Sequence, residues 1–192
     1  MRRINKKIWY IYNQLILKKL LGRLGNNSFI YKPLQIDNIK NINIDNDVYI
    51  AEGAWIYCGQ STKETLIIKE KTTIGHFAHI VALRDVEIEK EVMIADKVFI
   101  SDCTHCYENI EVPICKQPIR FLKRVVIGEG SWLGENVSIC GASVGKHCVI
   151  GANSVVTNDI PDYCVAVGSP ARVVKMYDDR DKEWKHISMK TT

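Results

Sequence analysis

The chain has 192 residues, of which 46% are hydrophobic and 25% are charged, a composition that suits one globular domain with a real core. Its formal net charge of +4 is concentrated at the start, because residues 1–25 contain seven basic residues and no acidic residue. The rest of the chain is close to neutral, which argues against a nucleic-acid-binding surface on the body of the protein. Any attraction for a polyanion is therefore expected at the N-terminus.

The first expected element is a basic helix or cap over residues 1–30. Its apolar run over residues 8–17 is interrupted at Asn13 and closed by Lys18, so it is shorter than the roughly 20 apolar residues of a transmembrane helix. No small-residue cleavage site follows, and a signal peptide is not expected. Two interpretations stay open: a helix that covers the end of the body, which we favour, or a basic amphipathic helix on a membrane surface.

From residue 44 onward an aliphatic residue returns at every sixth position, in blocks of two or three hexads. Examples of this first position are Ile44, Ile50, Ile56, Ile88, Ile94 and Ile100. A period of six is neither that of a helix nor that of an ordinary strand, and it indicates short strands joined by tight turns, three per coil. The expected fold is therefore mainly β, a three-sided parallel β-solenoid over residues 31–176 with the aliphatic residues inside. The second position is often small, and we expect glycine to allow the unusual dihedral angles of a turn there.

Three irregularities interrupt the six-residue rhythm. Residues 61–65 break it briefly, and one residue is missing between positions 139 and 144, where we expect a tighter turn. Residues 106–124 break it at length and contain two prolines. A long excursion from a regular scaffold is where function tends to lie, so this loop is the first candidate for a site. After the repeat, residues 177–192 are expected to form a C-terminal tail or helix.

Three segments, in this order along the chain, carry a resemblance to a known family. They are Ile-Gly-Glu-Gly-Ser-Trp-Leu-Gly at 127–134, Val-Gly-x3-Val-Ile-Gly-Ala-Asn-Ser-Val-Val-Thr-Asn-Asp-Ile-Pro at 144–161, and Val-Gly-Ser-Pro-Ala-Arg-Val-Val-Lys at 167–175. Over residues 36–176 the chain resembles the hexapeptide-repeat acyltransferases, in particular the sugar O-acetyltransferases that include galactoside and maltose acetyltransferases. The resemblance implies a left-handed parallel β-helix, acetyl-CoA as co-substrate with no metal required, and a homotrimer with active sites between subunits.

The resemblance places the family's catalytic histidine at His105, at the end of the segment Ile100-Ser-Asp-x-x-His and directly before the long loop. The implied chemistry needs such a residue, because a sugar hydroxyl is too weakly acidic to attack a thioester at neutral pH without a general base. Histidine titrates near neutral pH and suits this task. Transfer is expected to be direct: hydroxyl attack forms a tetrahedral oxyanion, which then expels the CoA thiolate. Asp102 is a candidate to orient an imidazole nearby.

The resemblance also assigns a set of residues to the pantetheine arm and phosphates of acetyl-CoA: Trp132, Gly134, Ala152, Thr157, Asn158, Arg172 and Lys175. The last two match a basic pair near the phosphates, although a solvated basic face would look the same in sequence. Asn158 is a departure, because relatives commonly carry lysine there, and phosphate contact is expected to be weaker. Glu135 is a second departure, at a position where a smaller serine can occur. For Trp132, the alternative to contact with acetyl-CoA is simpler: it is an aromatic side chain on an outer face of the solenoid.

The other histidines and the cysteine pair allow rival interpretations. His79 stands where sugar-specific relatives have an asparagine that contacts the acceptor, so it either binds the acceptor or is simply exposed; His76, His147 and His186 are expected at the surface. A zinc site of His76, His79 and His105, as in β-helical carbonic anhydrases, is disfavoured by the CoA-type motif near the C-terminus. The pair Cys103 and Cys106 lacks the strand-to-helix context of a redox motif.

The function favoured by the sequence is O-acetylation of a sugar hydroxyl by acetyl-CoA, in the synthesis of a bacterial surface polysaccharide. Two alternatives stay open: an antibiotic O-acetyltransferase of the chloramphenicol or streptogramin type, and a non-enzymatic β-solenoid that binds a partner. Seven scattered cysteines without an export signal favour a reducing cytoplasm. The basic N-terminal helix would allow peripheral contact with the inner face of the membrane, and the side chains of the long loop do not reveal the acceptor.

Overall fold

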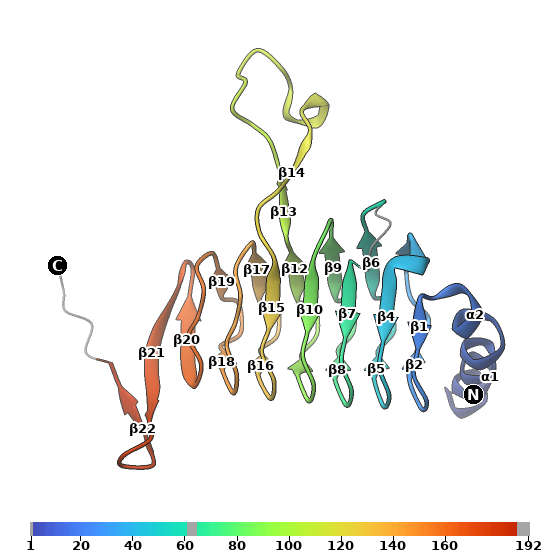
Figure 1. Ribbon diagram of the computed structural model, residues 1–192, viewed down its shortest axis with the longest axis horizontal. Helices are drawn as coiled ribbons and strands as arrows, with labels where there is room; N and C mark the ends of the chain where they lie inside the picture. The colour runs from blue at the N-terminus through green and yellow to red at the C-terminus, as the bar shows by residue number, and fades with distance from the viewer. Residues whose placement is uncertain (1, 61–64, 188–192) are drawn as a thin grey trace.

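The computed structural model describes residues 2–60 and 65–187. It shows an elongated solenoid with a helix at one end, a hairpin at the other and an arm that projects from one side (Figure 1). The expected interruption at 61–65 lies almost entirely outside the described residues. The predicted mainly β fold, a parallel β-helix with a short N-terminal helix, is confirmed.

Three sheets of parallel strands form the sides of the solenoid within the described residues. Sheet A consists of β1 (Arg23–Leu24), β4 (Ile42–Ile44), β7 (Leu66–Ile68), β10 (Val86–Ile88) and β15 (Val125–Ile127). Sheet B begins with β2 (Phe29–Ile30), β5 (Tyr49–Ile50), β8 (Thr73–Ile74), β11 (Met93–Ile94), β16 (Trp132–Leu133), β18 (Val149–Ile150) and β20 (Cys164–Gly168). Sheet C consists of β3 (Gln35–Asp37), β6 (Trp55–Cys58), β9 (His79–Ala82), β12 (Phe99–Ser101), β17 (Ser138–Cys140) and β19 (Val155–Val156).

The interior of the solenoid is a stack of the aliphatic residues that open the hexads. Members that are at most 2% exposed include Ile50, Ile56, Ile74, Ile80, Ile94 and Ile100. Strand pairing places them one above another, as with Ile56 on Ile80 and Ile80 on Ile100. Burial of each such side chain contributes roughly 1.5–3 kcal/mol of hydrophobic free energy. The six-residue period therefore arises because one residue per short strand must point into a narrow prism.

At the second position of the hexad, glycine is needed for a different reason from the one expected. The left-handed backbone conformation falls at the fourth position of the hexad, for example at Asp47 and Asn136, both with φ of 59°. Glycine at the second position is required by the close approach of the next coil. A Cβ added at Gly75 would lie 2.6 Å from the carbonyl carbon of Ala95, and one at Gly134 would lie 2.7 Å from the backbone nitrogen of Ala152. Spacing between coils, not turn geometry, keeps this position small.

The helical segment at the N-terminus is shorter than the expected residues 1–30. It runs as α1 (Arg2–Tyr12), a π-helical stretch η1 (Asn13–Leu17) and α2 (Lys18–Leu20). The boundary at residue 30 is wrong, because β1 and β2 already pair with β4 and β5 as part of the first coil. No helix among the described residues has both the length and the apolar character needed to cross a bilayer.

One face of this helical segment packs on the open end of the solenoid. Asn13 is fully buried there. Its amide oxygen accepts a hydrogen bond from the backbone N–H of Ile30 at 2.8 Å, and its amide nitrogen donates to the carbonyl oxygen of Ile30 at 2.9 Å. Leu17 and Leu21 join the core of the first coil. The segment thus satisfies backbone groups and covers apolar residues that the first coil would otherwise expose.

The C-terminal segment is a β-hairpin over the described residues, so the expected helix is wrong for 177–187. After β20 the chain reverses into β21 (Ala171–Asp178), which pairs antiparallel with β20 and with β22 (Glu183–His186). Because β21 pairs with β20 and β22 pairs with β21, these residues gain hydrogen-bond partners that an isolated short helix would lack. Residues 188–192 lie outside the described part of the chain.

The tighter turn expected after residue 139 is present, with Gly141 at φ 58° and Val144 bridged to Ile127.

Candidate active site

The long excursion between β12 and β15 is an antiparallel arm that projects from the solenoid (Figure 1). Its stem is β13 (Cys103–His105) paired with β14 (Ile119–Phe121), and its outer part contains a short 3₁₀ turn, η3 (Ile114–Lys116). The excursion was expected to start at residue 106, after a regular coil. The structure places its start at Cys103, so His105 is the last residue of the first strand of the stem and lies opposite Ile119.

Asp102 fixes the base of the arm. Its side chain is fully buried, and its carboxylate accepts hydrogen bonds from the backbone N–H groups of Leu83, Arg84 and Asp85 at 2.7, 2.8 and 2.9 Å. Its carbonyl oxygen accepts a further hydrogen bond from the N–H of Leu122 at 2.8 Å. A buried carboxylate directed at this turn is not available to the exposed imidazole of His105. The candidate role of Asp102 in orienting that imidazole is therefore wrong, and its role is to hold the arm against sheet C.

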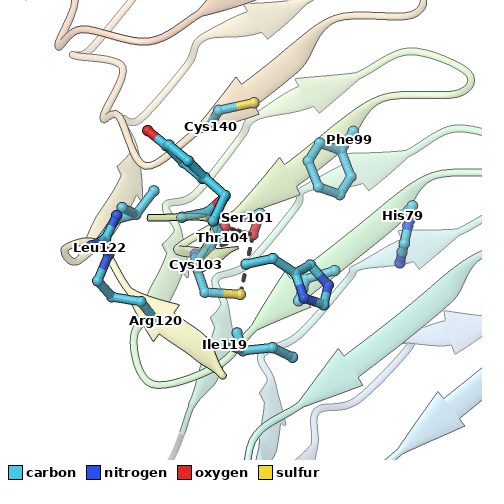
Figure 2. Close-up of a pocket in the computed structure, with 12 residues that line it drawn as sticks. His79, Phe99, Ser101, Cys103, Thr104, Ile119, Arg120, Leu122 and Cys140 are labelled. Atoms are coloured by element: carbon cyan, nitrogen blue, oxygen red, sulfur yellow. Dashed lines mark hydrogen bonds between the residues drawn. The ribbon is translucent and has the colours of Figure 1, made fainter. Parts of the chain in front are cut away.

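A cavity of about 520 Å³ lies where the arm meets the outer surface of sheet C (Figure 2). The solenoid contributes His79, Val81, Phe99, Ser101 and Cys140 to its walls, and the arm contributes Cys103, Thr104, His105, Tyr107, Ile119, Arg120 and Leu122. The walls are mainly apolar. Their polar groups include the imidazoles of the two histidines, the phenol of Tyr107 and the guanidinium of Arg120. Such a cavity, apolar with a few polar groups, is the usual form of a small-molecule site.

His79 lies in a ladder of aromatic rings on the outer face of sheet C. Its ring stacks on Trp55, with centroids 4.2 Å apart and planes 8° apart, and contacts the ring of Phe99 at 5.3 Å. Burial between these rings lowers the pKa of His79 below its ordinary value, because desolvation penalises the charged form. A neutral imidazole has one N–H donor and one acceptor nitrogen. His79 is thus suited to hydrogen-bond a hydroxyl group in the cavity.

Two polar groups of the cavity wall, Arg120 and Ser101, are tied to neighbouring groups of the chain. Arg120 pairs with Glu108 at 2.6 Å. Ser101 Oγ donates to the carbonyl oxygen of Cys103 at 2.9 Å and accepts from its N–H at 3.1 Å. Burial raises the pKa of the Cys103 thiol, so this residue lacks the thiolate character of a redox or metal-binding cysteine. Cys103 is therefore a wall residue of the cavity, and Cys106, which follows the stem strand, does not line it.

Comparison with known proteins supports the expected family. The profile described as "Bacterial transferase hexapeptide (six repeats)" matches residues 124–158. A putative lipopolysaccharide biosynthesis O-acetyl transferase of Escherichia coli is 31% identical over 181 residues, covering 90% of this chain and 91% of the relative. A galactoside O-acetyltransferase of Lactococcus lactis is 30% identical, covering 89% of this chain and 71% of the relative.

The chain belongs to the hexapeptide-repeat acetyltransferase family. Solved structures share the fold of this hexapeptide acetyltransferase. AntD, an N-acyltransferase from Bacillus cereus in complex with dTDP and 3-hydroxybutyryl-CoA, has a TM-score of 0.73 at 19% identity, covering 88% of this chain and 90% of that one. A hexapeptide-repeat acetyltransferase from Vibrio cholerae, complexed with acetyl-CoA, has a TM-score of 0.64 at 22% identity, covering 92% of this chain and 82% of that one.

The residues that the resemblance assigns to acetyl-CoA lie towards the C-terminal end of the hexapeptide acetyltransferase, away from the cavity walls. Trp132, 44% exposed, lies on sheet B between Met93 and Val149. Gly134 and Ala152 stack at the corner that follows. The remaining four, on or near the last strands of the solenoid, are Thr157, Asn158, Arg172 and Lys175.

None of these seven residues lines the cavity that contains His79 and His105. Two structural links join the regions. Lys123, at the base of the arm, pairs with Asp159 at 2.5 Å, directly after Asn158. Strand β17, whose Cys140 lines the cavity, pairs with β19, which ends directly before Thr157. Within a single chain of the hexapeptide acetyltransferase, the candidate base therefore lines the cavity and the residues assigned to CoA do not.

The histidines expected at the surface lie outside the cavity. His76 pairs with Asp96 at 3.2 Å, His147 stacks on Tyr163, and His186 lies on β22 opposite Lys175. Within the described residues, no group of three or more histidine, cysteine or acidic side chains has metal-binding geometry. The carbonic anhydrase-like set of three histidines is therefore not assembled within the described part of one chain.

Sequence reasoning missed the aromatic neighbours of His79. Trp55 and Phe99 occupy the sixth position of their hexads, as His79 does, and strand pairing places the three residues in one outward ladder. Aligning the hexads coil by coil would have found them. The interruptions between coils hid this alignment, because they make the sequence separation of stacked residues unequal.

Proposed function

We propose that the protein transfers the acetyl group of acetyl-CoA to a hydroxyl of a sugar, with His105 as general base. The observation that carries the proposal is the shared cavity: His105 on the arm and the neutral His79 on sheet C line the same space next to stacked aromatic rings. A sugar presents hydroxyl groups for the imidazoles and C–H faces for apolar and aromatic walls. Most of the chain is similar to O-acetyltransferases named for lipopolysaccharide biosynthesis and for galactosides.

The proposed reaction proceeds in one complex of enzyme, acetyl-CoA and acceptor. His105 accepts the proton of the acceptor hydroxyl as its oxygen bonds to the thioester carbonyl carbon. The resulting tetrahedral oxyanion collapses, the C–S bond breaks, and CoA leaves as a thiolate that takes up the proton from His105. The acceptor leaves as an acetyl ester. His79 holds the acceptor through hydrogen bonds, and the apolar walls limit access of water to the thioester.

The separation of the two candidate surfaces supports a homotrimeric active site. His105 lines the cavity on sheet C, none of the residues assigned to CoA lines it, and Trp132 among them lies on sheet B. Transfer needs the thioester and the base within bonding distance of one hydroxyl. In the proposed homotrimer, the CoA surface of one subunit faces the arm of the next. A role in polysaccharide biosynthesis in the cytoplasm is part of this proposal.

The function is tested with purified protein, acetyl-CoA and an acceptor panel of sugar nucleotides, oligosaccharides and chloramphenicol, with acetylated products detected by mass spectrometry. Acetylation of a sugar hydroxyl is the expected result. Acetylation of chloramphenicol alone would assign the protein to the antibiotic-modifying class instead. CoA should also raise the melting temperature, because a ligand of the folded state stabilises it. If CoA did not raise the melting temperature and no acceptor were acetylated, the protein would be assigned as a non-enzymatic solenoid.

Replacement of Arg172 tests the CoA surface. Arg172 is exposed on β21. Its guanidinium donates one hydrogen bond to the carbonyl oxygen of Ala171 at 3.0 Å, which leaves its other N–H groups for a phosphate of CoA. We expect Arg172→Ala to weaken acetyl-CoA binding about tenfold or more, because a charge-assisted hydrogen bond contributes roughly 1.5–3 kcal/mol. Isothermal titration calorimetry with acetyl-CoA measures this. The matched control is Arg180→Ala, which removes an exposed arginine from the turn of the same hairpin. An equal loss of affinity in both variants would contradict a specific contact.

A further inference from the structure

The helical segment at the N-terminus has a second apolar face that the solenoid does not cover. Ile8, Ile11 and Leu15 follow one another at helical spacing on the side away from the buried Asn13 and Leu17. They are 59%, 48% and 62% exposed. Isolated exposed aliphatic residues are ordinary, but a contiguous row on one helix face marks an interaction surface.

Exposed lysines accompany this apolar row. Lys7, Lys18 and Lys19 lie on the same helical segment as this row, and all three are exposed. Lys18 Nζ lies 3.4 Å from the amide oxygen of Asn26 on the first coil and donates a hydrogen bond to it. Within the described residues, no carboxylate forms an ion pair with any of them, whereas lysines on the solenoid are commonly paired, as Lys71 is with Glu91 and Lys97 with Glu135. The segment therefore combines an exposed apolar row with exposed lysines whose charge no carboxylate of the described residues compensates.

The segment lies at the extreme end of the solenoid, beyond β1 and β2 and opposite the C-terminal hairpin (Figure 1). Its other face is anchored by the buried Asn13 and by Leu17. The segment is thus held as a helix before any partner arrives. A flat partner can approach it without meeting the projecting arm, which lies several coils away (Figure 1).

We propose that this face docks the protein on the surface of an anionic lipid bilayer. The aliphatic row would enter the boundary between headgroups and acyl chains, and the lysine ammonium groups would contact lipid phosphates. Self-association through the same face is disfavoured, because a two-fold contact would bring the unpaired lysines of two copies together. The inference rests on the helix alone and does not depend on the proposed transferase reaction.

The test is co-sedimentation of the full chain with vesicles of phosphatidylcholine, with and without about 30% phosphatidylglycerol. Binding is expected only with the anionic lipid and is expected to weaken at about 0.5 M salt, because the charges are screened. The triple variant Lys7→Gln, Lys18→Gln, Lys19→Gln should bind about 100-fold more weakly, since each lysine near an anionic surface contributes about a fivefold factor. The double variant Ile8→Gln, Leu15→Gln should bind about 100-fold more weakly as well.

A matched control removes the same charge from exposed positions on the body of the protein: Lys40→Gln, Lys146→Gln and Lys182→Gln. This control should bind as the natural chain does, and every variant should keep its melting temperature. Equal loss in the control would show a net-charge effect and overturn the proposal, as would equal binding to neutral vesicles or no binding at all. A lower oligomeric state of the Ile8→Gln, Leu15→Gln variant in sedimentation velocity, without vesicle binding by the natural chain, would assign the face to contact between copies.

Discussion

His105→Ala is expected to lower kcat for acetyl transfer by about a thousandfold, because a positioned general base contributes roughly 10²–10⁴-fold to such a reaction. The imidazole lies at the end of β13 on the cavity wall, away from the residues assigned to CoA. Affinity for CoA should therefore stay unchanged. Steady-state kinetics with the acceptor found in the screen, combined with calorimetry for CoA, separates the two effects.

A matched control for this experiment is His76→Ala. His76 is also exposed, but it pairs with Asp96 on a turn of the solenoid and does not line the cavity. Its removal should leave kcat near the natural value. If His105→Ala turned over normally, or lost activity only together with CoA affinity or folding, the assignment of His105 as base would be wrong.

Asp102→Asn is expected to cause a large loss of stability, about 2–4 kcal/mol, since it removes the charge that accepts three backbone hydrogen bonds in a fully buried site. The new amide group would also direct N–H donors at backbone N–H donors. Urea denaturation followed by circular dichroism measures the free energy of unfolding. Activity should fall as well, because the base of the arm and hence the position of His105 depend on this carboxylate.

Asp96→Asn is the control for that substitution. Asp96 accepts a hydrogen bond from the backbone N–H of His76 at 2.7 Å, but its side chain is 47% exposed. Water can replace the lost interaction, so the expected cost is below about 1 kcal/mol. A normal free energy of unfolding for Asp102→Asn together with a collapse of kcat would contradict the structural role and restore a role of Asp102 in orienting His105.

The core could be predicted from the sequence because it depends on a local rule. Each aliphatic residue at the first position of a hexad was expected inside, and Ile56, Ile80 and Ile100 are at most 1% exposed. The reason for small residues at the second position was not predictable. It lies in the distance to the next coil, as the contact between Gly75 and Ala95 shows, and that distance involves residues far apart in the sequence.

The candidate site could be predicted in part. His105 and His79 were singled out by resemblance to the family, and the structure places both on one cavity. Their partners were not found, because Trp55 meets His79 only when two coils stack across an interruption of the repeat. Asp102 was assigned to the wrong partner for a similar reason. Its separation of three residues from His105 suggested a contact with that imidazole. The true partners are the backbone N–H groups of residues 83–85, in a turn of the preceding coil that the sequence spacing does not reveal.

At the two ends of the chain, too, the sequence predicted what depends on local pattern and missed what depends on distant residues. The N-terminal helix follows from its own apolar and basic pattern. The C-terminal residues were expected to form a tail or a helix, but β20 leaves an open edge, and pairing with that edge satisfies the backbone of β21. Whether an edge is free is a property of the assembled sheet.

By itself, the sequence determined the repeat, the residues that fill the solenoid and the family of the protein, because a period of six and an ordered set of motifs are local features. The tertiary structure alone decided where the arm leaves the solenoid, which rings surround His79, and which of the candidate site residues share one cavity. These features depend on how the coils stack. Stacking brings together residues that are far apart in the sequence, so no short segment of sequence predicts their contacts.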